Sequence, residues 1–321
     1  MNEQKNDPNN ASNKASNNEQ NKASDNVNNK EHKDESVSDQ KTALTNEQNN
    51  EQNNEQHNEP IIGLQMYSMI RLAEYDMTKT LEDIAKIGYQ AVELVGYYTY
   101  TPQQIRRNAK RFNLKIPSVH VPLRIYDEEK IMVDYEKSAE FAAEIGAKYI
   151  VIPWLPISEK FKENEVQYLV HLIGSCISVA KKNGLQLVLH NYSREFKLID
   201  GEFVLKELIG PFDKDQLKLE LDFGTIYISG IDPFKIYREY EDRSPLIHLR
   251  DVTIGRRDCK LGQGKIDYVN QLHQLPHLDN KILYVEQQFD KNHGLEHARD
   301  NFEFVKEQIQ RRQSPKQYQF S

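Results

Sequence analysis

Only two cysteines, Cys176 and Cys259, occur among the 321 residues. One lies in a predicted helix and the other in a predicted loop, and two cysteines do not make the disulfide framework of a small secreted domain. No apolar run approaches the roughly 18 residues that suggest a membrane-spanning helix, and the first residues lack the apolar core of a secretory signal. These absences indicate a cytoplasmic protein with no membrane partner.

A surplus of basic residues is also missing. The chain carries 42 Lys and Arg against 49 Asp and Glu, a net charge of −7. Residues 1–59 hold 6 Lys and 12 Asp or Glu, so the rest of the chain, with 36 basic and 37 acidic side chains, is close to neutral. A protein that neutralises phosphates needs clustered Lys and Arg. The sequence therefore argues against a nucleic-acid partner.

The first part of the chain has few apolar residues. Residues 1–59 consist mainly of Asn, Gln, Glu, Lys and Ser. Such a segment cannot bury enough apolar surface to offset the entropy lost when its backbone is ordered. We expect a disordered tail over 1–59, one folded domain over 60–310 and a flexible C-terminal tail over 311–321.

From Pro60 onward, short apolar runs alternate with helix-like stretches in which apolar residues recur at helical spacing, as at Leu81, Ile84 and Ala85. The predicted strands are 61–67, 90–95, 115–121, 148–153, 185–191, 217–222, 246–251 and 281–286. The predicted helices are 78–87, 102–112, 129–145, 163–182, 202–208, 232–239, 268–274 and 295–310.

This alternation predicts an α/β fold, a (β/α)8 TIM barrel, because eight strand-then-helix units in roughly 250 residues are its usual content. Gly88, Gly146 and Gly184 each follow a helical run, where a residue that tolerates positive φ is wanted, and Pro102 suits a first helical turn. A doubly wound open sheet is the alternative. It usually carries a Gly-rich turn after its first strand, and residues 65–68 do not resemble one.

Reactive side chains of such a barrel lie at the C-terminal ends of its strands. Neighbouring strands lie about 5 Å apart, so Asp222, His248 and Glu286, at the ends of consecutive strands, can meet at one ion. Two carboxylates and an imidazole suit one divalent metal ion, namely Mn, Mg or Co, with Zn also acceptable. The other polar residues at or near strand ends are His120, His190, Asn191 and Asp251.

The preceding strand offers two candidates for a fourth ligand. His190 closes the strand itself, and Glu195 follows five residues later. Glu195 is favoured, because a third carboxylate balances the charge of the ion and can also act as a general base. His190 remains the alternative.

The residues resemble the sugar phosphate isomerase/epimerase family of xylose isomerase-like barrels over nearly all of 61–310. Eight fragments occur in the family's order, and together they are far more specific than any one of them. These are Ile-Gly-Leu-Gln-Met-Tyr-Ser (62–68), Ile-Gly-Tyr-Gln-Ala-Val-Glu-Leu (87–94), Ser-Val-His-Val-Pro (118–122), His-Asn-x-x-x-Glu-Phe (190–196), Leu-Asp-Phe-Gly (221–224), His-Leu-Arg-Asp (248–251), Leu-Gly-Gln-Gly-Lys-Ile-Asp (261–267) and Val-Glu-Gln (285–287).

The resemblance implies a divalent-metal-dependent isomerase or epimerase that acts on a keto-sugar or sugar derivative. A carboxylate would remove a proton next to a carbonyl group that the ion polarises, with Glu195 and Glu286 as the paired acid and base. The implied metal ligands are Glu195 or His190, Asp222, His248 and Glu286. The candidate substrate contacts are His120, which resembles the family's substrate-facing histidine, His190, Arg250, Asp251 and Trp154.

Other interpretations stay open. The same site would also suit a dehydratase or lyase of an inosose or a 3-keto-glycoside. A barrel without catalysis that binds a sugar is a different class, and an endonuclease for abasic DNA would need a basic groove that the near-neutral charge does not favour. Arg250 and Asp251 could simply pair with each other, and Trp154 could pack on its own helix. Tyr192 and Arg250 stand where the family usually has His and Lys, and these departures leave the identity of the substrate open. The sequence is also compatible with a homo-oligomer.

Overall fold

The computed structural model describes residues 59–96, 99–123, 128–155, 163–287 and 293–313. The predicted tails at 1–59 and 311–321 therefore lie almost wholly outside the described residues. Among the residues that are described, none of the helices combines the length and the apolar character that crossing a bilayer requires. Both cysteines are free thiols.

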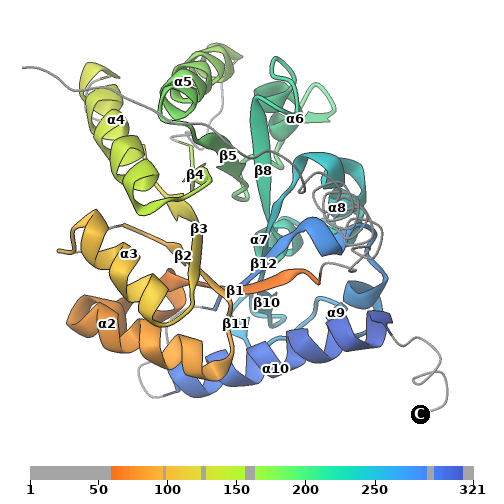
Figure 1. Cartoon of the computed structure of the whole chain (residues 1–321). Helices are drawn as coiled ribbons and strands as arrows, with labels where there is room; N and C mark the ends of the chain where they lie inside the picture. The colour runs from red at the N-terminus through yellow and green to blue at the C-terminus, as the bar shows by residue number, and fades with distance from the viewer. Residues whose placement is uncertain (1–58, 97–98, 124–127, 156–162, 288–292, 314–321) are drawn as a thin grey trace, which may run out of the picture. The chain divides into compact units, whose positions relative to one another are not determined.

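Eight parallel strands close into a barrel, in the order β1-β12-β9-β8-β5-β4-β3-β2 around the ring. Helices surround these strands (Figure 1), so the predicted (β/α)8 barrel is confirmed. Every predicted strand is present, with small shifts at its ends. The bounds are β1 (Ile61–Gln65), β2 (Ala91–Leu94), β3 (Lys115–His120), β4 (Tyr149–Ile152), β5 (Gln186–His190), β8 (Leu217–Asp222), β9 (Leu246–Leu249) and β12 (Ile282–Val285).

The helices follow the strands along the chain, and the last one, α10, lies beside α2 (Figure 1). Helix α10 runs to Gln313 and so passes the predicted domain boundary at residue 310. The bounds are α2 (Ile70–Ile87), α3 (Pro102–Arg111), α4 (Glu128–Ile145), α5 (Glu163–Lys182), α6 (Val204–Ile209), α7 (Phe223–Ile228), α8 (Pro233–Tyr240), α9 (Tyr268–Gln271) and α10 (Gly294–Gln313).

Short elements complete the connections. Two antiparallel hairpins lie outside the barrel, β6 with β7 and β10 with β11. Their bounds, with those of the 3-10 turns, are β6 (Leu198–Ile199), β7 (Glu202–Phe203), β10 (Asp251–Val252), β11 (Asp258–Cys259), η1 (Met66–Met69), η2 (Glu241–Arg243), η3 (Leu272–Gln274) and η4 (Leu278–Asn280).

Helix α2 begins at Ile70, earlier than the predicted start at residue 78, and it bends at Asp76, whose φ of −152° and ψ of 93° are not helical. The Asp76 carboxylate accepts a hydrogen bond from the Lys79 amide at 2.9 Å, as an N-cap does. The predicted start therefore marks the second segment of a bent helix.

Local signals at other helix ends behave as predicted. Pro102 occupies the first turn of α3, and Thr101 and Gln104 form a reciprocal capping box before it. Gly146 and Gly184 adopt φ of 85° and 70°, a left-handed conformation that lets the chain leave a helix and enter the next strand.

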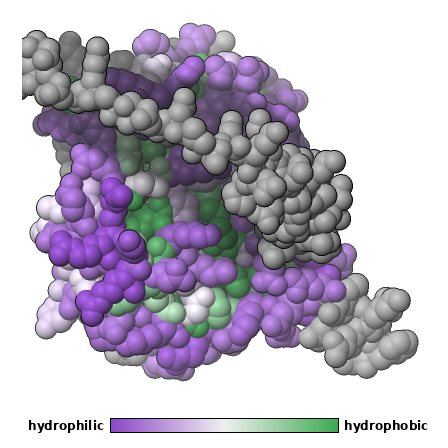
Figure 2. Space-filling model, in the orientation of Figure 1, coloured by the Kyte–Doolittle hydropathy of each residue, from purple (hydrophilic) through white to green (hydrophobic). Residues whose placement is uncertain are grey.

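The strands alternate between side chains that face the helices and side chains that face the barrel interior. On the face shown in Figure 2, hydrophobic residues gather in the middle and hydrophilic residues surround them. Inside the barrel, a separate apolar cluster consists of Ala91, Tyr149, Val151, Val188, Leu246, Ile282 and Tyr284. Toward the C-terminal ends of the strands the inward side chains become polar.

Candidate metal centre and cavity

A cavity of about 650 Å³ opens at the C-terminal ends of the strands. This volume is in the range of small-molecule sites, which is roughly 300–1,000 Å³. Seven of the nine site residues predicted from the sequence line it: His120, Trp154, His190, Glu195, Asp222, Arg250 and Glu286. The other two, His248 and Asp251, are fully buried and do not line it.

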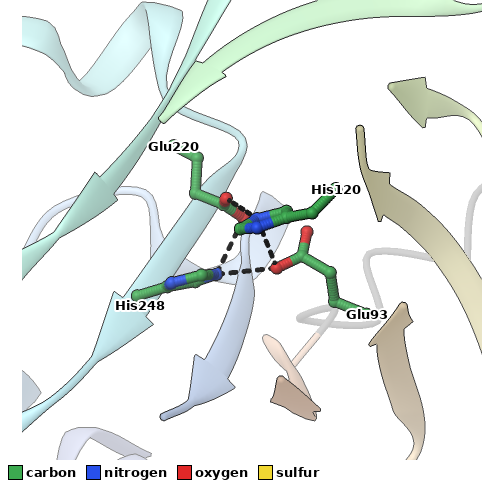
Figure 3. A group of neighbouring side chains, drawn as sticks. All are labelled: Glu93, His120, Glu220 and His248. Carbon is green, nitrogen blue, oxygen red and sulfur yellow. Dashed lines mark hydrogen bonds and ion pairs between the residues drawn. The ribbon is translucent and has the colours of Figure 1, made fainter. Parts of the chain in front are cut away.

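Beneath the cavity, four side chains from four strands point toward one another inside the barrel (Figure 3). They are Glu93 of β2, His120 of β3, Glu220 of β8 and His248 of β9, and we call them the interior cluster. Their potential ligand atoms all lie within 4.8 Å of one another. The two carboxylates and His248 have no exposed surface. A buried group of Glu and His residues such as this one fits a metal site.

The contacts of the interior cluster alternate between imidazole nitrogens and carboxylate oxygens. His120 Nε2 lies 2.7 Å from Glu220 and 3.0 Å from Glu93. His248 Nε2 lies 2.7 Å from Glu93 and 3.1 Å from Glu220. Burial acts to lower the pKa of His120, but Glu93 and Glu220 raise it to about 9.

A second group shares His248 and lies at the cavity. His190, His248 and Glu286 also have ligand atoms within 4.8 Å of one another, and His248 Nδ1 lies 2.8 Å from Glu286 Oε2. Asp222 lies next to this group without being a member of it. Its Oδ2 lies 3.9 Å from His190 Nε2, and its Cα is paired with that of His248 in the strand register. The structure thus brings His190, His248 and Glu286 together, and the role of Asp222 as a ligand stays a prediction.

His190 has one unused nitrogen. Its Nδ1 lies 2.9 Å from the Pro153 carbonyl oxygen, which can only accept, so Nδ1 carries the hydrogen. Burial lowers the pKa of His190, so the ring is neutral and Nε2 holds a lone pair. That atom is buried and has no hydrogen-bond partner. A metal-binding histidine usually has this arrangement, with its other nitrogen donating to a backbone carbonyl or a carboxylate.

Asp222 ends β8 and also caps α7. Its carboxylate accepts hydrogen bonds from the amide and the hydroxyl of Thr225. Arg250 Nη1 lies 3.4 Å from Asp222 Oδ2. The same guanidinium donates hydrogen bonds of 2.8 to 3.1 Å to the carboxylate of Asp258. Arg250 is therefore a fixed positive charge in the cavity wall.

The two predicted catalytic carboxylates differ in their ionisation. Burial raises the pKa of Glu195 to about 7, although the Tyr192 amide donates a hydrogen bond to it at 3.0 Å. Burial acts to raise the pKa of Glu286 as well, but the hydrogen bond and charge of His248 lower it to about 2. Near neutral pH, Glu195 can therefore both take and release a proton, whereas Glu286 stays ionised.

Glu195 belongs to neither of the two ligand groups found among the described residues. Its assignment as a metal ligand stays a prediction. The alternative left open by the sequence, His190, is the residue that the structure places beside His248 and Glu286.

Asp251 is directed away from the cavity. Its carboxylate accepts hydrogen bonds from the backbone amides of Val252, Gly262, Gly264 and Ile266 at 2.9 to 3.2 Å. The structure does not support a substrate contact by Asp251, because those amides occupy its oxygens and shape the following loop around them. The alternative of an Arg250–Asp251 pair also fails, since Arg250 pairs with Asp258.

Three polar residues near the site were not predicted to take part. They are Glu93, Glu220 and Gln65. The Gln65 amide donates to Glu93 at 3.2 Å. The signal for Glu220 was available, because it lies two residues before Asp222 on one strand and so faces the same side.

Comparison with known proteins agrees with the fold. The sequence model of a family described as xylose isomerase-like TIM barrel matches residues 81–308. An inosose dehydratase from Geobacillus kaustophilus is 21% identical over 195 residues, covering 56% of this chain and 63% of the relative. The chain thus matches somewhat less than two thirds of that relative's length.

Solved structures show the same architecture. A sugar phosphate isomerase/epimerase from Parabacteroides distasonis superimposes with a TM-score of 0.66 at 22% identity, covering 78% of this chain and 94% of the other. The IolI protein, solved with a bound zinc atom, superimposes with a TM-score of 0.64 at 16% identity, covering 78% and 98%. At these identities the likeness shows the fold.

Proposed function

Because the chain belongs to the xylose isomerase-like TIM barrel family, we propose that it is a divalent-metal-dependent enzyme that isomerises or epimerises a keto-sugar or sugar derivative. The substrate is a small keto-sugar or a polyol that carries one keto group, and its proton is removed from the carbon next to that carbonyl group. The observation that carries the proposal is the buried, unpartnered Nε2 of His190 beside Asp222, His248 and Glu286.

In this proposal His190, Asp222, His248 and Glu286 hold the ion. Their two carboxylates balance the charge of a divalent cation, and their two imidazoles make the set softer than an all-oxygen site. Mn, Co and Zn suit such a set better than Mg, which prefers oxygen ligands and bound water. When bound, the ion would polarise the substrate carbonyl as a Lewis acid.

Glu195 is proposed as the group that moves the proton. Its pKa of about 7 is close to the value at which a general base works best near neutral pH. Glu195 is buried at the wall of the cavity. This burial is the largest influence on its pKa and raises it. Glu286, with a pKa of about 2, suits a permanently ionised ligand better than a proton carrier.

The remaining cavity residues would bind and orient the substrate. Trp154 is 50% exposed and presents an apolar surface on which one face of a sugar can lie. The fixed guanidinium of Arg250 adds positive charge at the wall, and His120 reaches the cavity from the interior cluster.

A second candidate reaction, the dehydration of an inosose or 3-keto-glycoside, is favoured by one observation: several curated relatives are named inosose dehydratase. Both reactions would begin with removal of the same kind of proton. They differ in the second step, since a dehydratase loses a hydroxyl group from the neighbouring carbon and an epimerase or isomerase returns the proton.

Proton NMR in D2O separates these reactions. Mn2+-loaded protein is incubated with keto-sugars, inososes and 3-keto-glycosides, and the ion is removed with a chelator before spectra are recorded. We expect one substrate to exchange its α-proton for deuterium, with a new stereoisomer or a dehydrated product. Glu286→Gln should abolish this exchange while the fold persists. A wild-type rate in that variant would remove Glu286 from the site, and failure of the protein to retain any metal would favour a sugar-binding barrel without catalysis.

A further inference from the structure

The proposed reaction makes no direct use of Glu93 and Glu220, the two carboxylates of the interior cluster. We propose that Glu93, Glu220 and His120 form a positioning layer that fixes the hydrogen of His248 on Nε2, so that the Nδ1 lone pair faces the metal site. This inference rests on the proposed function, because it assigns Nδ1 of His248 to the ion.

The position of His248 does not by itself determine which ring nitrogen carries the hydrogen. Both ring nitrogens face carboxylates: Nδ1 lies 2.8 Å from Glu286, and Nε2 lies 2.7 Å from Glu93. A histidine that binds an ion through one nitrogen keeps its hydrogen on the other. The neighbours of the two nitrogens therefore decide which one is available to the ion.

Burial settles this choice. Glu93 and Glu220 have no exposed surface, so water cannot replace a lost hydrogen-bond donor. If Nε2 of His248 carried a lone pair, it would face two buried carboxylates and leave Glu93 without its short contact, which is costly in the interior of a protein. Glu286 differs, because its side chain is 16% exposed and lines the cavity. The hydrogen therefore belongs on Nε2.

His120 keeps the layer ionised and in place. Its Nε2 contacts Glu220 at 2.7 Å and Glu93 at 3.0 Å, so one imidazole neutralises part of the charge of both carboxylates. The two shortest contacts pair each imidazole with a different carboxylate, His120 with Glu220 and His248 with Glu93 (Figure 3). With the two longer contacts of 3.0 and 3.1 Å, these hydrogen bonds form a ring of two imidazoles and two carboxylates, in which Glu93 Oε1 and Glu220 Oε1 have no hydrogen-bond partner among the described residues.

An ion bound inside the ring is the alternative use of these four side chains. The two contacts of 2.7 Å are typical of charge-assisted hydrogen bonds, and the metal stoichiometry measured below distinguishes the two uses.

The first test measures the tautomer. Protein labelled with ¹⁵N in histidine is loaded with Zn2+, which is diamagnetic, and the His248 signals are assigned by comparison with His248→Gln. We expect the chemical shifts of a metal-bound Nδ1 and a protonated Nε2. A metal-bound Nε2 with the hydrogen on Nδ1 would overturn the inference.

The second test measures Zn2+ affinity by competition with a chelator. Glu93→Gln keeps the size of the side chain and removes its charge, and we expect the Kd to rise about 10- to 100-fold with one ion still bound. The control is Ser118→Ala, which removes a buried hydroxyl that contacts the Tyr284 hydroxyl at 2.8 Å rather than His248. It should change the melting temperature with little effect on Kd.

The outcomes are distinguishable. If wild-type protein binds no Zn2+, the proposed function fails and the inference fails with it. If wild-type protein binds Zn2+ and Glu93→Gln binds it equally well, only the inference fails. Two ions in wild-type protein and one in Glu93→Gln would make Glu93 a ligand and would also overturn it. Glu220→Gln is the second variant if Glu93→Gln does not fold, and we expect the same direction of change.

Discussion

His190 and Glu195 lie five residues apart, and the structure gives them different environments. Nε2 of His190 is a buried lone pair without a partner, whereas Glu195 accepts a hydrogen bond from the Tyr192 amide and has a pKa that burial raises to about 7. The sequence could not choose between them as ligands, because the choice depends on the Pro153 carbonyl, which lies on another strand connection.

A pair of variants separates these two roles. His190→Ala should weaken metal binding by about 100-fold or more, since it removes a ligand. Glu195→Gln should leave the metal Kd nearly unchanged and lower kcat by about 10²- to 10⁴-fold, the usual contribution of a general base. Titration with Mn2+ and steady-state kinetics measure the two effects. A large loss of metal affinity in Glu195→Gln would restore Glu195 as a ligand.

The pH dependence follows from the same carboxyl group. Burial raises the pKa of Glu195 to about 7, so the group is mostly protonated, and cannot accept a proton, in weakly acid solution. At saturating metal, kcat should rise with pH through about 7 and level off above it. Rates recorded at several pH values test this, and a profile that is level from about pH 6 to 8 would exclude Glu195 as the base.

At the scale of single elements, the sequence predicted strands and long helices better than the connections. The eight strands were predictable because each is a short apolar run buried on both faces. The conformation of the loop over residues 261–266 was not predictable. Its anchor, Asp251, lies more than ten residues earlier in the chain, and the hydrogen bonds that join them are a tertiary contact.

Asp251→Asn tests this anchor. The substitution removes a buried negative charge and turns one acceptor into a donor that faces backbone amides such as that of Gly264. Because bonds to charged groups contribute about 1.5–3 kcal/mol each and unsatisfied buried donors are costly, we expect a loss of about 2–4 kcal/mol in the free energy of unfolding. Urea denaturation measures it. A stability equal to that of the wild type would show that the loop does not depend on Asp251.

For the whole molecule, the order of eight strand-and-helix units was enough to predict the barrel and the end of it that carries the site. The sequence also placed seven of the residues that line the cavity, because a barrel displays its strand ends on one side. It could not show which inward residues below the mouth, such as Glu93 and Glu220, approach His248. That approach depends on the register between strands, for example Asp222 opposite His248, which no single segment contains.

Metal binding should stabilise the entire barrel, since its ligands come from four separate strands or strand ends. An ion present at 100 times its Kd adds about 2.7 kcal/mol to the free energy of unfolding, which raises Tm by roughly 5–10 °C for a domain of this size. Thermal unfolding with EDTA or with Zn2+ measures the shift. His190→Ala should show a much smaller shift at the same Zn2+ concentration, and equal shifts in both proteins would place the ion elsewhere.

The position of the ion can be measured directly by anomalous diffraction from crystals of the Mn2+-loaded protein, with data collected on both sides of the manganese absorption edge. The account predicts one anomalous peak at the cavity, bonded to His190, Asp222, His248 and Glu286. A peak inside the ring of Glu93, His120, Glu220 and His248, or no peak at either place in fully loaded protein, would contradict it.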